Sequence, residues 1–422
     1  MHLPDGARPL AAVLAAVLLA SCGSPSTPTS PMGSAAAGTS LPGGFTPGAA
    51  GPTATPAPVP GHELFGFVPY WEMDDTIAGH IASTPLSTVA LFSVTNTSTG
   101  AISRSQTGYK RITGSVGEGI VAAAHRRGTR VEIVFSSFGT SRNASFFAKV
   151  PLQDATIAAL VALVDDLGID CVDVDVEGLD SGLVPAYGAF VGRLRAALVA
   201  SRPDATVSVA TTPGPDGAVM AAAAVGAGAD RVFLMGYDYR TAGSSPGAVA
   251  PVLRADVGRS LTWSLDLYGD LGVPPGRLLL GLPLYGMAWP VAGPVTGAPA
   301  TGDGSAWILR QHLDVLRNPA AVPQTDPLEA VDVYFLGSDG SLVAPAAASA
   351  AGASAVPQPP APSGVAWTAV YVDSPATLAV KLGLGEQRGL AGAGFWAIGY
   401  ERGLPAYTDL FARYVAGAVP PS

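Results

Sequence analysis

Eight short apolar runs, separated by segments with helical periodicity, are the feature that most restricts the fold of this 422-residue chain. One separating segment repeats Ile157, Leu160, Val161 and Val164 at helical spacing and ends at Gly168. Strand-length runs that are apolar on both faces are typical of parallel strands covered by helices. The eight runs span residues 64–71, 88–94, 130–139, 169–177, 206–213, 231–238, 277–286 and 392–399.

This alternation predicts an α/β fold, the closed (β/α)8 TIM barrel. The alternative is a doubly wound open sheet, which would usually bring a glycine-rich phosphate-binding loop. We find no such loop in the sequence, so we favour the barrel.

The segment between the seventh and eighth runs is far longer than one helix requires. Within it, residues 329–342 predict a hairpin around Ser338-Asp339-Gly340, and residues 342–364 are of low complexity. We therefore predict a small β-rich insertion at residues 291–370. The barrel domain would then comprise residues 62–290 and 371–415.

The N-terminal residues resemble an export signal rather than part of the fold. Residues 10–20 form an apolar run that is too short to span a bilayer comfortably. The run ends in Leu19-Ala20-Ser21-Cys22, which resembles the lipobox of bacterial lipoproteins. We therefore expect residues 1–21 to be a signal peptide and Cys22 to carry a lipid, although an ordinary signal peptide with an incidental Cys22 is the alternative.

Residues 22–61 contain no charge and almost no large apolar side chain, which is typical of a disordered tether. A lipid and a tether predict a bacterial cell-envelope protein on the outer side of the cytoplasmic membrane, or a secreted one. The lipid would be its only membrane contact, and we expect a monomer.

The charge and the metal-binding residue types exclude several classes of protein. The net charge is −9 without a basic block, which argues against nucleic acid as a partner. The two cysteines, Cys22 and Cys171, rule out a disulfide framework and cysteine-rich metal sites. No two of the five histidines are close in sequence, so we predict neither a metal site nor a cofactor.

Three acidic residues alternate with valines along the fourth run. Side chains alternate along a strand, so Asp173, Asp175 and Glu177 share one face at steps of about 6.6 Å. The valines on the other face suit packing against helices, so the acidic face should point into the barrel. Glu177 would then lie at the carboxyl end of the strand, where barrel active sites form.

Carboxylates at this spacing cannot all ionise easily, so at least one pKa should be raised. A glutamic acid that is protonated near neutral pH can serve as a general acid. The spacing alone leaves two alternatives open, a polar layer satisfied by its neighbours and a hard-cation site with oxygen ligands.

The sequence Asp170 to Glu177 resembles the DxxDxDxE signature of the family 18 glycoside hydrolases, the chitinase-like barrels. Further motifs follow in the family's order, and the resemblance covers residues 62–415. The stretches 67–71 and 235–252 look closest to the bacterial spore-germination-like branch, which acts on N-acetylglucosamine-containing polymers. The other motifs are residues 135–139, similar to SxGG, 235–238, similar to MxYD, 278–286, similar to GxPxYG, and 370–401, similar to the final helix and strand.

The resemblance implies a retaining glycosidase in which the substrate's own 2-acetamido oxygen attacks C1. Glu177 would protonate the leaving oxygen and then deprotonate water. Asp175 would hold the acetamido N–H, and Asp173 would buffer Asp175 from below. Tyr237 would hydrogen-bond the acetamido oxygen. The matched fourth-strand motif offers no carboxylate opposite Glu177 that could replace this nucleophile.

The same resemblance implies a set of substrate-binding residues. Asp238 would support the sugar contact, and Trp396 would form an apolar floor under the reacting ring. Tyr70 and Trp71, at the end of the first strand, could line a sugar subsite. The remaining expected substrate-binding residues, taken from the sixth- and seventh-strand motifs, are Met235 and Tyr285.

Three positions depart from the family's pattern. Cys171 replaces the usual glycine, and we expect a buried thiol without a cationic neighbour, hence a raised pKa and no role as a nucleophile. Val176 replaces an aromatic residue, and Met287 stands where many members have arginine. These changes suggest altered subsites, so the substrate is predicted only as an N-acetylglucosamine-containing oligo- or polysaccharide such as chitin, peptidoglycan or an N-glycan core. The alternative function is a non-catalytic, carbohydrate-binding lipoprotein on the same barrel.

Overall fold

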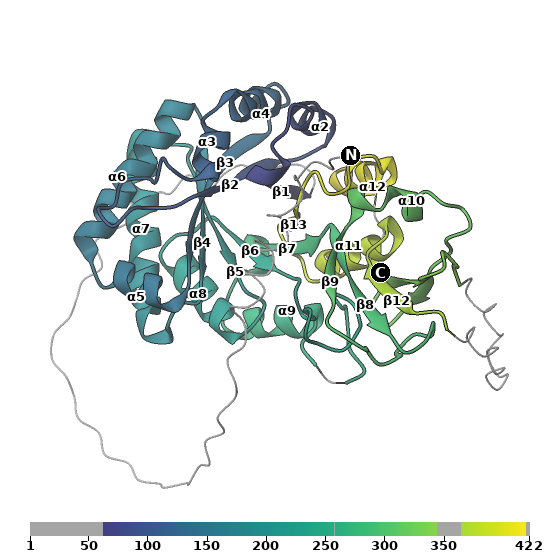
Figure 1. Cartoon of the computed structure of the whole chain (residues 1–422). Coiled ribbons are helices and arrows are strands. Elements are labelled where there is room, and N and C mark those ends of the chain that lie inside the picture. The colour runs from purple at the N-terminus through teal and green to yellow at the C-terminus, as the bar shows by residue number, and fades with distance from the viewer. Residues whose placement is uncertain (1–61, 257, 344–363, 419–422) are drawn as a thin grey trace, which may run out of the picture.

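The computed structural model describes residues 62–256, 258–343 and 364–418 (Figure 1). The predicted signal peptide (1–21), the tether (22–61) and the lipid-bearing Cys22 lie outside these residues. Most of the low-complexity loop also lies outside them.

Eight parallel strands close into a barrel in the order β1, β13, β7, β6, β5, β4, β3, β2, with β2 next to β1. The predicted (β/α)8 fold is therefore confirmed, and the open sheet is excluded. The barrel strands are β1 (Glu63–Pro69), β2 (Thr88–Val94), β3 (Arg130–Phe138), β4 (Cys171–Glu177), β5 (Val207–Thr211), β6 (Arg231–Met235), β7 (Leu278–Pro283) and β13 (Gly392–Trp396).

Helices surround the barrel and bury one face each against it (Figure 1). In α7 (Val184–Ser201) Tyr187, Phe190 and Leu194 are fully buried, as their spacing of three to four residues requires. The helices of the barrel layer are α2 (Ile77–Ser83), α3 (Thr107–Ile112), α4 (Ser115–His125), α5 (Thr140–Phe147), α6 (Val150–Leu167), α7 (Val184–Ser201), α8 (Pro215–Gly226), α9 (Leu261–Asp270), α11 (Pro375–Gln387) and α12 (Pro405–Val415).

Aromatic rings fill one side of the barrel interior. Phe67 of β1 and Phe233 of β6 meet edge to face with their centroids 4.8 Å apart. Gly281 of β7 and Gly394 of β13 make room for them, because a Cβ atom at either glycine would come within 2.6 Å of the Phe233 ring. The buried polar side chains of β3, β4 and β5 therefore share the barrel interior with aromatic rings, where unpaired charge is costly.

The predicted seventh strand, residues 277–286, divides into two strands. The barrel strand β7 ends at Pro283, and the backbone N–H of Leu284 donates to the carbonyl of Trp396 at 2.7 Å. From Tyr285 the chain continues as β8, which leaves the barrel and pairs with strands of a second sheet.

The second sheet is antiparallel, in the order β10, β11, β12, β8, β9, and it fits the predicted β-rich insertion. It begins before residue 291 and ends after residue 370, because β8 and β12 flank the insertion and pair with each other. The predicted hairpin around residue 339 is present in short form: Leu336 and Leu342 form an antiparallel bridge, and the backbone N–H of Gly337 donates to the Ser341 carbonyl at 2.8 Å. The elements are β8 (Tyr285–Val291), β9 (Ser305–Ile308), α10 (Leu313–Leu316), β10 (Gln324–Asp326), β11 (Val331–Gly337) and β12 (Trp367–Val372).

A buried ion pair attaches this sheet to the loop that follows β6. The Arg240 guanidinium donates to both oxygens of Glu329, at 2.5 and 2.7 Å. The backbone N–H of Ala248 donates to the same carboxylate at 2.8 Å. A bidentate pair of this kind fixes both position and orientation, so the insertion is held against the carboxyl end of the barrel.

Candidate functional site

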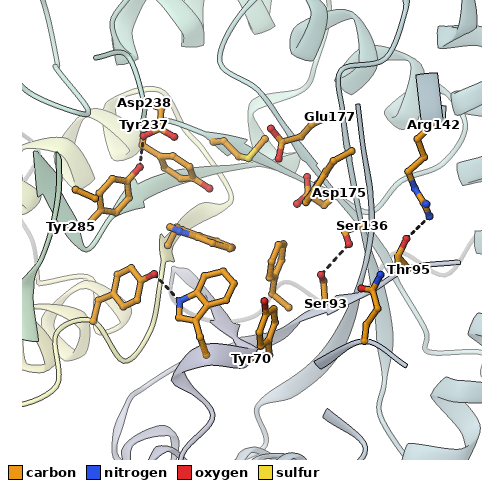
Figure 2. A pocket seen from close by; sticks show the side chains of 18 of the residues that line it. Tyr70, Ser93, Thr95, Ser136, Arg142, Asp175, Glu177, Tyr237, Asp238 and Tyr285 are labelled. Carbon is orange, nitrogen blue, oxygen red and sulfur yellow. Dashed lines mark hydrogen bonds between the residues drawn. The ribbon is translucent and has the colours of Figure 1, made fainter. Parts of the chain in front are cut away.

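A pocket of about 420 Å³ lies at the carboxyl ends of the barrel strands, with one wall formed by the second sheet (Figure 2). This volume lies within the usual range for small-molecule and sugar sites. The residues that line it are Tyr70, Trp71, Phe92, Ser93, Thr95, Gln106, Ser136, Phe138, Arg142, Asp175, Glu177, Met235, Tyr237, Asp238, Tyr285, Met287, Ala306, Trp396 and Tyr400.

The three acidic residues of β4 rise through the barrel as the sequence predicts. Asp173 is fully buried below the pocket, Asp175 is 4% exposed at its base, and Glu177 is partly exposed beside it. The strand register places Ser136 of β3 beside Asp175. Among the described residues, no group of three or more His, Cys, Asp or Glu side chains could hold a metal ion, so the cation-site alternative finds no support there.

Burial raises the pKa of all three carboxyl groups on β4. It raises the pKa of Glu177 to about 7, and the charge of Asp238 adds to that shift. The pKa of Asp175 rises well above its usual value, through burial and the charges of Glu177 and Asp173. Burial raises the pKa of Asp173 to about 7 against an opposing hydrogen bond from Ser208. Glu177 is thus substantially protonated near neutral pH and open to the pocket, as a general acid must be.

A second group of polar side chains stands on the other side of the pocket. The hydroxyl of Tyr285 donates to Asp238 Oδ1 at 2.5 Å, while burial raises the pKa of Asp238 to about 6. Figure 2 shows the Tyr237 hydroxyl pointing into the pocket toward Asp175 and Glu177. Burial raises the pKa of the Tyr237 phenol, so this hydroxyl keeps its proton and can donate to a ligand oxygen.

Aromatic rings form the remaining wall and the floor. The partly exposed Trp396 contacts Phe92 edge to face at 4.9 Å between centroids, and Trp71 at 6.1 Å. The indole N–H of Trp71 donates to the Tyr400 hydroxyl at 3.0 Å, which fixes the Trp71 ring. Apolar and aromatic surface beside a few polar groups is the usual composition of a small-molecule binding site.

The structure brings almost all of the residues expected at the site into one pocket, although this placement alone does not test their roles. Asp173 alone lies beneath it, as its expected supporting position requires. The expected residues that line the pocket are Tyr70, Trp71, Asp175, Glu177, Met235, Tyr237, Asp238, Tyr285 and Trp396.

Sequence reasoning missed the contribution of the loops after β2 and β3. Ser93 and Thr95 come from the end of β2 and the residues that follow it, and Arg142 from the first turn of α5. The Ser93 and Ser136 hydroxyls are 3.0 Å apart (Figure 2). Polar residues at the carboxyl ends of barrel strands were the available signal for these positions.

A further carboxyl group, Glu132 of β3, lies in the barrel floor below Asp173. The Ser208 hydroxyl oxygen is 2.5 Å from Glu132 Oε2 and 2.7 Å from Asp173 Oδ1. A hydroxyl group has one proton to donate, so both contacts are hydrogen bonds only if one of the two carboxyl groups is protonated. Burial, together with the charge of Asp173, raises the pKa of Glu132 to about 8, above that of Asp173, which favours Glu132 as the protonated partner.

The expectation that Cys171 has no cationic neighbour is wrong. Arg130 Nη2 lies 2.7 Å from its sulfur, and the Thr206 hydroxyl lies 3.0 Å from it. The thiol is nevertheless fully buried, and burial outweighs the guanidinium and raises the pKa of Cys171 to about 11. Cys171 is therefore a protonated floor residue outside the pocket.

The Glu132 carboxyl group predicts a specific dependence of stability on pH. The pKa of Glu132 is about 8 in the folded state and 4.5 in the unfolded state. The contribution of Glu132 to the free energy of unfolding is therefore fully present below pH 4.5 and is lost as pH rises toward 8. We expect Glu132→Gln to remove this pH dependence. Between pH 4.5 and pH 8 the free energy of unfolding of the variant should therefore rise by roughly 3–5 kcal/mol relative to that of the wild type. Urea unfolding across this pH range measures the effect. The exposed Glu118→Gln is the control, and parallel stability curves for wild type and Glu132→Gln would contradict the assignment.

Comparison with known proteins gives results that agree with this geometry. The family described as glycosyl hydrolases family 18 matches residues 64–401. The curated Nod factor hydrolase protein 1 of Medicago truncatula is 28% identical over 180 residues, which cover 41% of this chain and 39% of that protein. The chain thus spans about two fifths of the length of that relative.

Solved structures share the fold at low sequence identity. A family 18 chitinase of Cycas revoluta, in complex with (GlcNAc)3, has a TM-score of 0.67 at 17% identity, covering 83% of this chain and 99% of that one. The spore cortex-lytic enzyme SleL of Bacillus cereus has a TM-score of 0.62 at 16% identity, covering 84% of this chain and 74% of that one.

Proposed function

This chain belongs to the glycosyl hydrolases family 18, and from that premise we propose that it is a retaining glycosidase that cleaves β-N-acetylglucosaminyl linkages. Its substrate is an oligo- or polysaccharide containing N-acetylglucosamine, which binds in the pocket at the carboxyl end of the barrel. The chitinase of similar fold that was solved with (GlcNAc)3 supports this substrate class.

Glu177 carries the proton transfers of the proposed reaction. It gives its proton to the glycosidic oxygen as the bond from C1 to that oxygen breaks, and the leaving sugar departs as an alcohol. The carboxylate that remains then removes a proton from the water that attacks C1, which restores the acid. A pKa of about 7 leaves both forms accessible near neutral pH.

The substrate supplies the nucleophile in this proposal. The carbonyl oxygen of the 2-acetamido group attacks C1, which gives a cyclic oxazolinium intermediate, and water reopens it with net retention. Asp175 holds the acetamido N–H and stabilises the positive charge that develops there. The Tyr237 hydroxyl donates to the acetamido oxygen from the opposite wall, and Trp396 supports the sugar ring.

One observation carries the proposal: Glu177, Asp175 and Tyr237 converge on one pocket, where Glu177 is accessible and burial raises its pKa to about 7 (Figure 2). The rival is a lectin on the same barrel, which has no need of a buried acid whose pKa matches neutral pH. Three stacked carboxyl groups that form no ion pair within the described part of the chain are costly to keep for sugar binding alone.

The release of the aryl group from an aryl N-acetylchitooligosaccharide by the soluble barrel domain tests this function. A hydrolase releases it with multiple turnovers, whereas a lectin binds the same compound without release. Binding without turnover across neutral pH would exclude the hydrolase and leave the lectin.

We also propose that lipid on Cys22 anchors the protein to the outer side of the cytoplasmic membrane. The lipobox-like residues and the uncharged tether after them support this. Cys22→Ala should release the protein from the membrane fraction into the medium, because the variant has no thiol to carry a lipid and the apolar run at residues 10–20 is too short to span a bilayer comfortably. Fractionation after a salt wash measures the shift, and Ser21→Ala is the matched control. Retention of Cys22→Ala in washed membranes would contradict the anchor.

A further inference from the structure

Arg142 places a fixed positive charge in the rim of the pocket. It comes from the first turn of α5, directly after β3. Among the described residues that line the pocket, it is the only Lys, Arg or His side chain. Its Nε donates to the Ser137 hydroxyl at 3.2 Å, and its Nη2 lies 2.5 Å from the Thr95 hydroxyl oxygen. Figure 2 shows it on the side of Asp175 and Glu177 away from Tyr237 and Tyr285.

The guanidinium is also held at a constant position relative to the proposed acid. The Ser137 hydroxyl donates to Asn143 Oδ1 at 2.7 Å, and the Asn143 amide donates to the backbone carbonyl of Glu177 at 2.7 Å. Three successive hydrogen bonds thus connect Arg142, through Ser137 and Asn143, to the strand end that presents Glu177. A charge positioned this firmly can select a substituent of the bound glycan.

All the acceptors that hold Arg142 are neutral. They are the hydroxyl groups of Ser137 and Thr95 and, through Nη2, the backbone and side-chain oxygens of Asn96, at 3.0 and 2.7 Å. No carboxylate among the described residues forms an ion pair with it, and no bond of its Nη1 is seen there. The side chain is exposed and remains charged at neutral pH, so the site has one positive charge to share with a ligand.

We propose that Arg142 forms a subsite for a carboxylate on the sugar next to the reacting N-acetylglucosamine, and that this sugar is N-acetylmuramic acid. This rests on the proposed function and selects among its substrates. N-acetylmuramic acid is N-acetylglucosamine with a lactyl ether on O3, so a glycan of alternating N-acetylglucosamine and N-acetylmuramic acid bears a carboxylate on every second sugar. Chitin bears no carboxylate, so a bound chitin chain would leave Arg142 Nη1 without an anionic partner.

The surface beside Arg142 suits a sugar ring that carries such a group. Phe138, four residues earlier, is 36% exposed and stacks on Phe92 with an interplanar angle of 22°. The aromatic face offers apolar contact to the ring while the guanidinium receives the carboxylate. Hydrogen bonds to charged groups are among the stronger ones in proteins, and a partly desolvated pair gains further.

Matched tetrasaccharides test the proposal. The first alternates N-acetylglucosamine and N-acetylmuramic acid, the second is the same glycan with each lactyl carboxylate converted to a methylamide, and the third is chitotetraose. We expect the wild type to have at least about tenfold higher kcat/KM for the carboxylate form than for the methylamide, mainly through KM. Arg142→Gln should reduce this ratio to about one, and Arg142→Lys should retain part of it. The exposed Arg104→Gln, which removes the same charge outside the pocket, should keep the wild-type ratio.

The outcomes separate this inference from the proposed function. If the wild type cleaves none of the three glycans, the proposed function fails. If it cleaves the carboxylate and methylamide forms equally, or if Arg142→Gln leaves their ratio unchanged, the subsite is wrong while the hydrolase stands. Even if Arg142→Gln does not fold, comparing the carboxylate and methylamide glycans on wild-type protein shows whether the carboxylate is recognised. A preference for a glucuronate-containing N-acetylglucosamine oligosaccharide over the muramic one would also overturn the assignment.

Discussion

Glu177→Gln is expected to lower turnover of an aryl N-acetylchitooligosaccharide by at least about 10²-fold, the lower end of the usual contribution of general acid–base catalysis. Glutamine keeps the shape of the side chain but has no proton to transfer to the leaving oxygen. The variant should fold and bind oligosaccharide as well as the wild type does, because glutamine keeps the size of the side chain and burial already favours the neutral form of Glu177. Steady-state kinetics together with a direct binding titration measure the two properties separately.

The pH dependence provides a second check on the same residue. Since Glu177 must be protonated to act as the acid, wild-type kcat/KM should fall as pH rises through about 7. The residual kcat/KM of Glu177→Gln should not fall with pH in this range. An unchanged turnover in the variant would remove Glu177 from the mechanism, and Glu118→Gln on the exposed face of α4 serves as the control.

A substrate with glucose in place of N-acetylglucosamine at the cleaved position should not be hydrolysed, because it lacks the acetamido oxygen that attacks C1. Its N-acetylated counterpart should be cleaved under the same conditions. A thiazoline mimic of the oxazolinium ring should inhibit competitively, since it presents the ring that Asp175 and Tyr237 are placed to hold. Product analysis of the two substrates side by side is the measurement.

The structure supplies a specific rival for this mechanism. Asp238 of the sixth-strand motif lines the same pocket, and its charge contributes to the raised pKa of Glu177. A pair of carboxyl groups could act as acid and nucleophile without help from the substrate. The Tyr285 hydroxyl holds Asp238 at 2.5 Å, which favours a supporting role. Comparable cleavage of the acetamido and hydroxyl substrates would falsify substrate assistance and transfer the role of nucleophile to Asp238.

The barrel and the line of acidic residues on β4 could be predicted because both depend on the sequence pattern within each strand. Eight apolar runs with helical segments between them admit few folds, and alternation along one strand fixes which face Asp173, Asp175 and Glu177 share. The family motifs then placed Tyr237, Asp238 and Trp396 at strand ends. All of these positions follow from sequence neighbours within a single strand.

The loops and the floor could not be predicted in the same way, because they depend on which strands become neighbours. Glu132 and Asp173 meet through Ser208, and these residues belong to three different strands whose register fixes the contact. The Arg130 contact to Cys171, which the sequence reading denied, has the same origin. Neither contact leaves a pattern in the linear sequence.

The sequence by itself determined the barrel, the order of its strands along the chain and the line of carboxyl groups on β4, because side-chain periodicity acts within each strand. Only the tertiary structure decided the rest: that β8 leaves the barrel to build a pocket wall, that Asp238 faces Glu177, and that Arg142 brings to the rim a positive charge with no ion-pair partner among the described residues. The physical reason is distance along the chain. Burial and charge set the pKa values and the ligand preference of the site, and both arise from residues that closure of the barrel brings together.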